Sequence, residues 1–195
     1  MSRAAEQAAL RVARRAIEEG LVDVSYAAVD SPFGSLLAAS TDQGLVRLAF
    51  PEENVDTVLE RLATRLSPRI VEAPTPPQTV LRELDEYFSG RRREFELALD
   101  WSLIGPFGRK VLTVTSEIPY GGVLSYSEVA AEAGSPRGSR AAGNALGSNP
   151  IPIVIPCHRV LRTGGSLGGY GGGLDRKRWL LELEGALTPK LSAGR

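Results

Sequence analysis

The sequence has 195 residues, of which 43% are apolar and 24% charged, and this suits one large or two small globular domains. Its formal net charge is zero, and no run approaches the roughly 18 consecutive apolar residues of a membrane span, which excludes a membrane-spanning protein. The charged N-terminus lacks the apolar stretch of a signal peptide. One cysteine allows neither an internal disulfide nor a multi-cysteine zinc site, so we expect a cytoplasmic protein.

The first predicted elements are a helix and a small group of strands. Alanines, Val12 and Ile17 recur at helical spacing over residues 4–20, which predicts an amphipathic helix within an N-terminal extension, residues 1–23. Three short apolar runs follow, separated by turn-forming residues, and they predict an antiparallel meander. These runs are residues 24–29, 35–40 and 45–50.

Two more helices and a strand complete the first predicted domain, residues 24–103. Residues 54–66 have the apolar spacing of a helix, and Asn54 is its expected cap. Residues 79–90 predict a second helix that ends at a glycine. Residues 94–100 alternate apolar and polar side chains, as a half-buried strand does.

The second predicted domain, residues 104–187, starts with a helix at residues 109–118 and leaves residues 188–195 as a tail. A Ser-x-x-Glu capping box at residues 125–128 begins another helix. A third helix, rich in small residues, follows at 140–150. Two short helices joined by a glycine-containing turn predict either a helix-turn-helix or an ordinary pair of packed helices in an α+β fold.

Charge is divided unevenly between the two halves of the chain. Residues 101–195 contain 11 Lys or Arg against 6 Asp or Glu, a net charge of +5, whereas residues 1–100 contain 12 against 17, a net charge of −5. The excess is either scatter or a C-terminal surface for a polyanion such as nucleic acid.

The stretch VIPCHRV, residues 154–160, holds the only cysteine and the only histidine. The apolar run Ile151 to Ile155 predicts a buried strand or extended segment that ends at a proline. A thiol reacts as its thiolate, so a base or cation must activate Cys157, and His158 and Arg159 are the nearest. Neighbours in an extended chain point to opposite faces, so contact between the thiol and the imidazole needs a turn or a water. The alternative is a buried cysteine without chemistry.

The glycine-rich segment TGGSLGGYGGG, residues 163–173, follows this stretch. It lacks the Gly-Lys-Ser/Thr ending of a phosphate-binding loop and does not fit the Rossmann pattern, which excludes a nucleotide cradle. We expect neither a cofactor nor a metal site.

The motif PCHRV, preceded by GSNPIPIVI and followed by GGYGGGLDRKRWLLELEG, resembles the active-site region of O6-alkylguanine-DNA alkyltransferases, the methylated-DNA–protein-cysteine methyltransferases. The resemblance covers roughly residues 25–187 and is strongest at 119–185. It implies an α+β fold. A small ribonuclease-H-like α/β domain with an antiparallel sheet would precede a winged helix-turn-helix-like helical domain.

The resemblance also implies catalytic roles. Cys157 resembles the acceptor of the alkyl group, and Tyr126 resembles the phenol that supplies a hydrogen bond or a proton to the departing guanine. His158 resembles the base that draws the thiol proton through a water, and Glu184 the carboxylate that orients it. Asn149 resembles the residue that braces the turn beside the thiol.

Further residues would bind DNA and the base. Arg140 resembles the finger that fills the space of a flipped nucleotide in alkylated double-stranded DNA, and the loop around Tyr170 would close over that base. The other expected DNA contacts are Ala141, Ala142, Gly143, Ser125 and Arg159. The other expected contacts with the base are Tyr126, Val160 and Gly171.

The chain departs from some family members at Gly171, where they carry a hydroxyl residue, and lacks their fused multi-cysteine zinc domain. Three functions are open: single-use repair of O6-alkylguanine and O4-alkylthymine on Cys157, lesion sensing without transfer, or hydrolysis by a Cys–His pair. The presence of Cys157, Tyr126 and Glu184 together favours repair. We also expect a monomer, as is common for a DNA-repair protein of this size.

Overall fold

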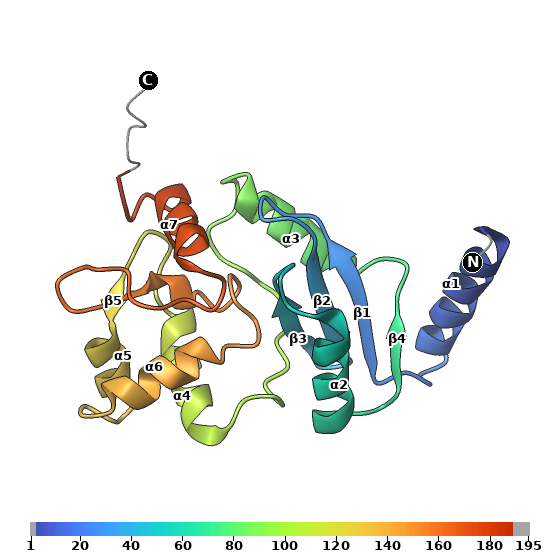
Figure 1. Ribbon diagram of the computed structural model, residues 1–195, viewed down its shortest axis with the longest axis horizontal. Coiled ribbons are helices and arrows are strands. Elements are labelled where there is room, and N and C mark those ends of the chain that lie inside the picture. Colours follow the sequence, from blue (N-terminus) through green and yellow to red (C-terminus); the bar gives the residue numbers. More distant parts are fainter. Residues whose placement is uncertain (1–2, 189–195) are drawn as a thin grey trace. The chain divides into compact units, whose positions relative to one another are not determined.

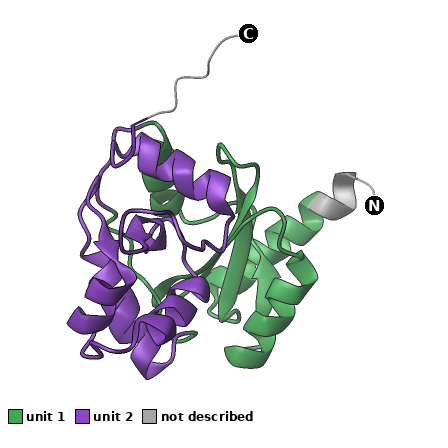
Figure 2. Cartoon of the chain, turned by 60° about the vertical axis from the view of Figure 1, so that its left-hand side comes forward, with its two compact units in different colours: residues 1–89, 95–103 green, residues 90–94, 104–195 purple. Residues whose placement is uncertain are grey.

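The computed structural model describes residues 3–188, with side chains from residue 7 onward, so the predicted tail lies outside the described residues except for Thr188 (Figure 1). Two compact units divide the chain (Figure 2). Unit 1 comprises residues 1–89 and 95–103, and unit 2 comprises residues 90–94 and 104–195. Within the described part, no helix combines the length and apolar character needed to cross a membrane.

Unit 1 is built on a four-stranded sheet in the order β3-β2-β1-β4. Its elements are α1 (Arg3–Glu18), β1 (Val24–Val29), β2 (Leu36–Thr41), β3 (Gly44–Ala49), α2 (Val55–Arg65), β4 (Ile70–Glu72) and α3 (Gln78–Phe88). The predicted helices and the three-stranded meander are therefore confirmed. Asn54 caps α2 as expected, because its side-chain oxygen accepts from the Thr57 N–H at 2.9 Å.

The sheet is mixed rather than wholly antiparallel. β1 pairs antiparallel with β2, and β2 with β3, but β4 runs parallel to β1. A parallel neighbour needs a crossover, which α2 provides between β3 and β4. One face of the sheet and α2 share a core that contains Val24, Ala39, Val46 and Leu62.

Residues 94–100 do not form the predicted strand. Their only pairing is a bridge between Leu99 and Leu45, where the Leu45 N–H donates to the Ala98 carbonyl at 2.9 Å. The alternation in the sequence corresponds to an alternation in burial, since exposed and half-buried side chains alternate along the segment. It reflects packing of an extended segment rather than a ladder of strand hydrogen bonds.

Unit 2 is mainly helical. Its elements are α4 (Pro106–Ser116), β5 (Leu124–Ser125), α5 (Tyr126–Glu132), α6 (Ser139–Gly147), the 3-10 turn η1 (Cys157–Arg159), β6 (Val160–Leu161) and α7 (Leu174–Leu183). Helices α5 and α6 pack against each other and against α4, and β5 pairs with β6 in parallel. This is the predicted C-terminal helical domain with its helix–turn–helix pair.

The apolar run before the cysteine is buried but is not a strand. Ile151, Ile153 and Ile155 are completely buried. The chain turns there, because the Ile155 N–H donates to the Ile151 carbonyl at 2.9 Å and Ile153 has a positive φ of 75°. Prolines in this segment lack the N–H that a strand ladder needs. The apolar pattern therefore predicted the burial of this segment correctly, but it did not predict the turn.

Candidate active site

Cys157 opens the 3-10 turn η1, directly after a proline, and is only 6% exposed. Asn149 fixes its position: the carboxamide nitrogen donates to Cys157 Sγ at 3.2 Å and to the Ile155 carbonyl at 2.9 Å. The Asn149 oxygen accepts from the Ile151 N–H at 3.0 Å. Asn149 therefore ties the apolar turn to the thiol.

Burial raises the pKa of the Cys157 thiol, although the Asn149 hydrogen bond and the charge of Lys177 act in the opposite direction. The resting group is therefore a thiol rather than a thiolate. A reaction at this sulfur needs a base that removes its proton.

His158 and Glu184 form a fully buried pair, with 2.9 Å between Nε2 and Oε1. Burial lowers the pKa of His158, against the opposing effect of Glu184, so the imidazole is neutral. An ionised carboxylate only accepts hydrogen bonds, so Nε2 carries the proton and Nδ1 is left as an acceptor. Nδ1 is buried and has no hydrogen-bond partner among the described residues.

Glu184 lies just after the last residue of α7. Burial alone would raise its pKa, but hydrogen bonds from His158 and Arg159 and the charge of Arg159 outweigh burial and lower the pKa to about 2. The carboxylate is thus ionised throughout the physiological range. It can hold the imidazole in one tautomer, as a triad carboxylate does.

Tyr126 is the first residue of α5, and its hydroxyl donates to the Gly169 carbonyl at 3.2 Å. Burial, and after it the electrostatic effect of Cys157, raises the pKa of Tyr126, so the phenol keeps its proton at neutral pH. Glycine is required at position 168, because a Cβ there would come within 2.9 Å of the ring. A Cβ on Gly143 would make an ordinary contact with the ring at 3.7 Å.

Lys177 is a site residue that the sequence analysis missed. It is completely buried on α7, and Nζ donates to the carbonyls of Val160 at 2.6 Å and Gly169 at 3.2 Å. Burial lowers its pKa to about 8, against the effect of Cys157. The signal was present: Lys177, Leu180, Leu181 and Glu184 follow the i, i+3, i+4, i+7 spacing of one helix face, and all four are buried.

The residues expected near the base are only partly brought together. Tyr170 lies against His158, with ring centroids 6.4 Å apart. The carbonyl of Val160 accepts from Lys177, and its N–H donates to the Cys157 carbonyl, so both backbone groups are engaged within the unit. Gly171 is exposed, and a Cβ there would meet no atom closer than 3.8 Å.

The expected DNA contacts divide by exposure. Arg140 and Ala141 are exposed on the first turn of α6, whereas Ala142 is completely buried and Gly143 faces Tyr126. Arg159 is 5% exposed, and its guanidinium is bound to Glu184 at 2.8 and 2.9 Å. This placement does not fit the DNA contact expected for Arg159, because its guanidinium is buried and paired with the Glu184 carboxylate.

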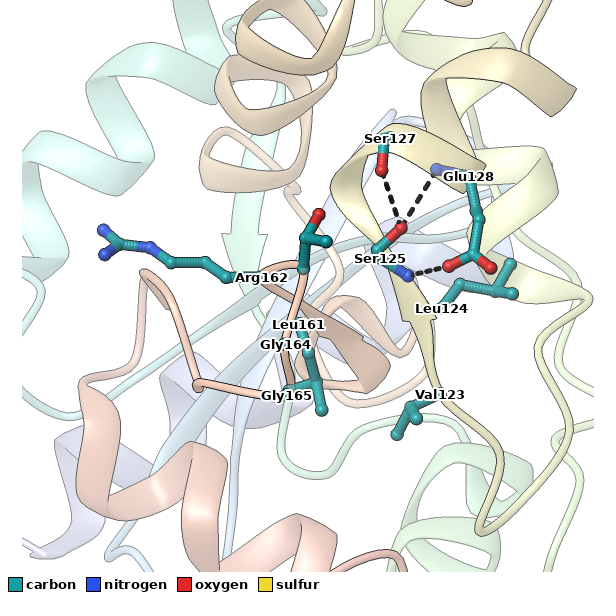
Figure 3. A pocket seen from close by; sticks show the side chains of 10 residues that line it. Val123, Leu124, Ser125, Ser127, Glu128, Leu161, Arg162, Gly164 and Gly165 are labelled. Atoms are coloured by element: carbon teal, nitrogen blue, oxygen red, sulfur yellow. Dashed lines mark hydrogen bonds between the residues drawn. The ribbon is translucent and has the colours of Figure 1, made fainter.

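Ser125 forms the predicted capping box (Figure 3). Its N–H donates to the Glu128 carboxylate at 2.6 Å, and its hydroxyl accepts from the Glu128 N–H at 3.2 Å. These residues line an open cavity of about 410 Å³ together with the loop after β6, where the Arg162 side chain points away from Ser125 (Figure 3). Ser125 thus starts the helix that carries Tyr126.

Among the described residues, no group of His, Cys, Asp and Glu could hold a metal ion. The site is therefore a thiol, an imidazole–carboxylate pair, a phenol and a buried amine, all in unit 2. Such a set supports nucleophilic attack by sulfur with proton transfer to and from the reacting groups.

Residues 24–101 match the family described as "6-O-methylguanine DNA methyltransferase, ribonuclease-like domain", and residues 106–186 match its "DNA binding domain". A methylated-DNA–protein-cysteine methyltransferase of Mycolicibacterium paratuberculosis is 42% identical over 167 residues, which are 85% of this chain and 95% of the relative. One from Methanosarcina acetivorans is 36% identical over 83% of this chain and 98% of the relative.

Solved structures agree with the sequence matches. Mycobacterium tuberculosis O6-methylguanine methyltransferase has a TM-score of 0.72 and 38% identity, covering 86% of this chain and 96% of that one. Mycobacterium tuberculosis OGT in complex with DNA has a TM-score of 0.71 and 39% identity, covering 82% of this chain and 92% of that one.

Proposed function

The chain belongs to the 6-O-methylguanine DNA methyltransferase family, and we propose that it repairs DNA by moving the alkyl group of O6-alkylguanine onto its own Cys157. The substrate is alkylated double-stranded DNA, with O4-alkylthymine as a second lesion of the same chemistry. The product is a thioether without a water-labile bond, so each molecule acts once and needs no cofactor. The protein works as a monomer in the cytoplasm.

One observation carries this proposal. His158 follows the buried Cys157 in the chain, and its pairing with Glu184 through Nε2 leaves Nδ1 able to accept a proton. In the proposed reaction, His158 Nδ1 takes the Cys157 proton through a water, and the sulfur attacks the alkyl carbon. The bond between that carbon and guanine O6 breaks as the new C–S bond forms. The electron pair of the broken bond goes to guanine.

Tyr126 completes the proton balance. Guanine is a poor leaving group unless it gains a proton as it departs, and the raised pKa of Tyr126 keeps a proton available there. Asn149 holds the sulfur through its 3.2 Å hydrogen bond. Lys177 fixes the backbone that positions Tyr126, since both donate to the Gly169 carbonyl.

Access to a paired base requires the nucleotide to leave the helix. We assign this step to residues 104–187, with α6 against the DNA and Arg140 in the space of the flipped nucleotide. The exposure of Arg140 and Ala141 and the small residues of α6 support this assignment. Tyr170 and the loop at Gly171 would cover the base.

Two other functions use the same residues differently. A lesion sensor would need no base beside its cysteine, and the buried His158–Glu184 pair argues against it. A cysteine hydrolase would use that pair, but it gives no role to an exposed arginine on a small-residue helix.

Incubation with O6-benzylguanine separates these functions. Alkyl transfer predicts one covalent benzyl adduct per molecule at Cys157 and no further turnover. No adduct would favour the sensor, and repeated ester or peptide cleavage would favour the hydrolase.

A further inference from the structure

The Glu184 carboxylate has a cationic partner, Arg159, besides its contact with the neutral His158. Arg159 Nε donates to Oε2 at 2.8 Å, and Nη2 donates to Oε1 at 2.9 Å. Its third nitrogen, Nη1, donates to the Ile118 carbonyl. The guanidinium is thus held at three points inside the unit, in the two-pronged geometry that arginine makes best with a carboxylate.

The turn after α4 holds this pair in place. The Tyr120 hydroxyl donates to the Leu183 carbonyl at 2.9 Å, one residue before Glu184. The Arg159 guanidinium carbon lies 5.9 Å from the centroid of the same Tyr120 ring. Gly121 donates its N–H to Glu184 Oε2 at 3.3 Å, and its φ of 77° favours glycine.

This arrangement decides where charge lies around His158. The charged groups that face His158 are Glu184, Arg159 and Lys177, beside the Cys157 thiol and the Tyr170 ring. A buried carboxylate needs a positive partner, because an unpaired buried charge is costly. With Arg159 as that partner, the imidazole can stay neutral. Without it, the Glu184 charge would favour a proton on His158.

We propose that Arg159 is a positioning residue for the transfer reaction: it balances the negative charge of Glu184, so that His158 stays neutral and its Nδ1 can accept the Cys157 proton. Tyr120 supports this role, because its ring lies beside Arg159 and its hydroxyl holds the Leu183 carbonyl next to Glu184. This inference rests on the proposed alkyl transfer, and it assigns the arginine of the PCHRV stretch to the relay rather than to DNA.

The test measures covalent labelling by excess O6-benzylguanine from about pH 5 to about pH 9, a range that spans the titration of histidine. The amplitude of labelling reports the folded fraction, and the rate constant reports the chemistry of that fraction alone. The variants are Arg159→Met, Arg159→Lys and Tyr120→Phe. Arg137→Met, at an exposed arginine of the same unit, is the matched control.

For Arg159→Met we expect a rate constant about tenfold lower near neutral pH. The acid limb, the pH range in which the rate constant falls as the pH is lowered, should lie about one pH unit higher, because His158 then takes up a second proton more readily. Arg159→Lys keeps the charge but not the two-pronged contact, so the acid limb should return towards the parent while the rate stays reduced. Tyr120→Phe should lower the rate without moving the limb. Arg137→Met should match the parent.

An Arg159→Met rate constant and pH profile that overlay the parent would overturn the inference, even if the labelled amplitude falls. If Arg159→Met does not fold, Arg159→Lys decides: a parental rate constant contradicts the role of the two-pronged contact. A parent protein that never labels contradicts the proposed function instead, which keeps the two failures apart.

Discussion

The amine of Lys177 and the phenol of Tyr126 share one acceptor, since each donates to the Gly169 carbonyl at 3.2 Å. Lys177 Nζ also lies 5.9 Å from the centroid of the Tyr126 ring. A residue on α7 and a residue on α5 are thereby joined through the glycine-rich loop between β6 and α7. The loop therefore forms part of the site, and its position depends on the buried amine of Lys177.

Replacing Lys177 by Met should therefore impair the chemistry. The substitution removes the hydrogen bonds to Gly169 in the loop and to Val160 in β6, and it removes the positive charge that opposes the raised pKa of Cys157. We expect labelling by O6-benzylguanine to slow by about tenfold or more, since a lost hydrogen bond to a charged group corresponds to roughly that factor. Lys110→Met, at an exposed lysine of α4, should label at the parental rate. Equal rates for both variants would remove Lys177 from the site.

Lys177 also predicts a pH dependence of stability. Its pKa is about 8 in the folded protein against an ordinary value of 10.5, so the unfolded chain binds more protons between these values. The free energy of unfolding should therefore gain a contribution that increases from about pH 8 to about pH 10.5. Urea unfolding of the parent and Lys177→Met across this range measures it. If the two proteins show the same dependence, the lysine is not buried as described.

Replacing Glu184 by Gln should move the reaction to higher pH. The imidazole loses the carboxylate that favours its protonated form, so it becomes a weaker base towards Cys157, and more of the rate then depends on direct ionisation of the thiol. The pH profile of single-turnover labelling measures this change. A profile identical to the parent's would show that Glu184 takes no part in the relay.

Tyr126→Phe should slow transfer by about ten- to ten-thousand-fold, the range in which general acid catalysis operates. The ring remains and can still pack beside Gly168 and Gly143, so affinity for alkylated duplex should change little. Single-turnover rates and binding isotherms on the same duplex measure both quantities. An unchanged rate would mean that another group protonates the departing guanine.

Arg140→Ala should separate flipping from chemistry. If Arg140 offsets the few kcal/mol lost when a guanine leaves the stack, its loss should slow repair of duplex DNA by about tenfold or more. A free alkylated base needs no flipping, so its reaction with Cys157 should be nearly unaffected. Equal losses on both substrates would place Arg140 in support of the active site itself.

What the sequence predicted well were features fixed by local chemistry. The Asn54 cap and the Ser125–Glu128 capping box depend on residues three apart, and both are present. The three-stranded meander follows from short apolar runs and turns. The resemblance placed Cys157, His158, Glu184, Tyr126 and Asn149 at sites that the fold gathers in one unit.

What the sequence could not give were contacts made across the fold. In the sequence, Arg159 looks like a surface cation beside a reactive cysteine. Its burial depends on the ion pair with Glu184 at the end of α7, 25 residues further along the chain. Lys177 stands between two arginines in the sequence, so its burial is visible only through the helical spacing of its neighbours. The parallel strand β4 is three residues long, too short to leave a periodic pattern.

The most direct test is the intact mass of the protein after incubation with duplex DNA that carries O6-methylguanine. We expect the parent protein to gain one methyl group in place of a hydrogen, located on Cys157 by peptide mapping, and we expect added free guanine not to reverse this gain. Cys157→Ala should gain nothing while still binding the lesion. A methyl group found on the Cys157→Ala protein, or an unmodified parent after the lesion has disappeared from the DNA, would contradict alkyl transfer to Cys157.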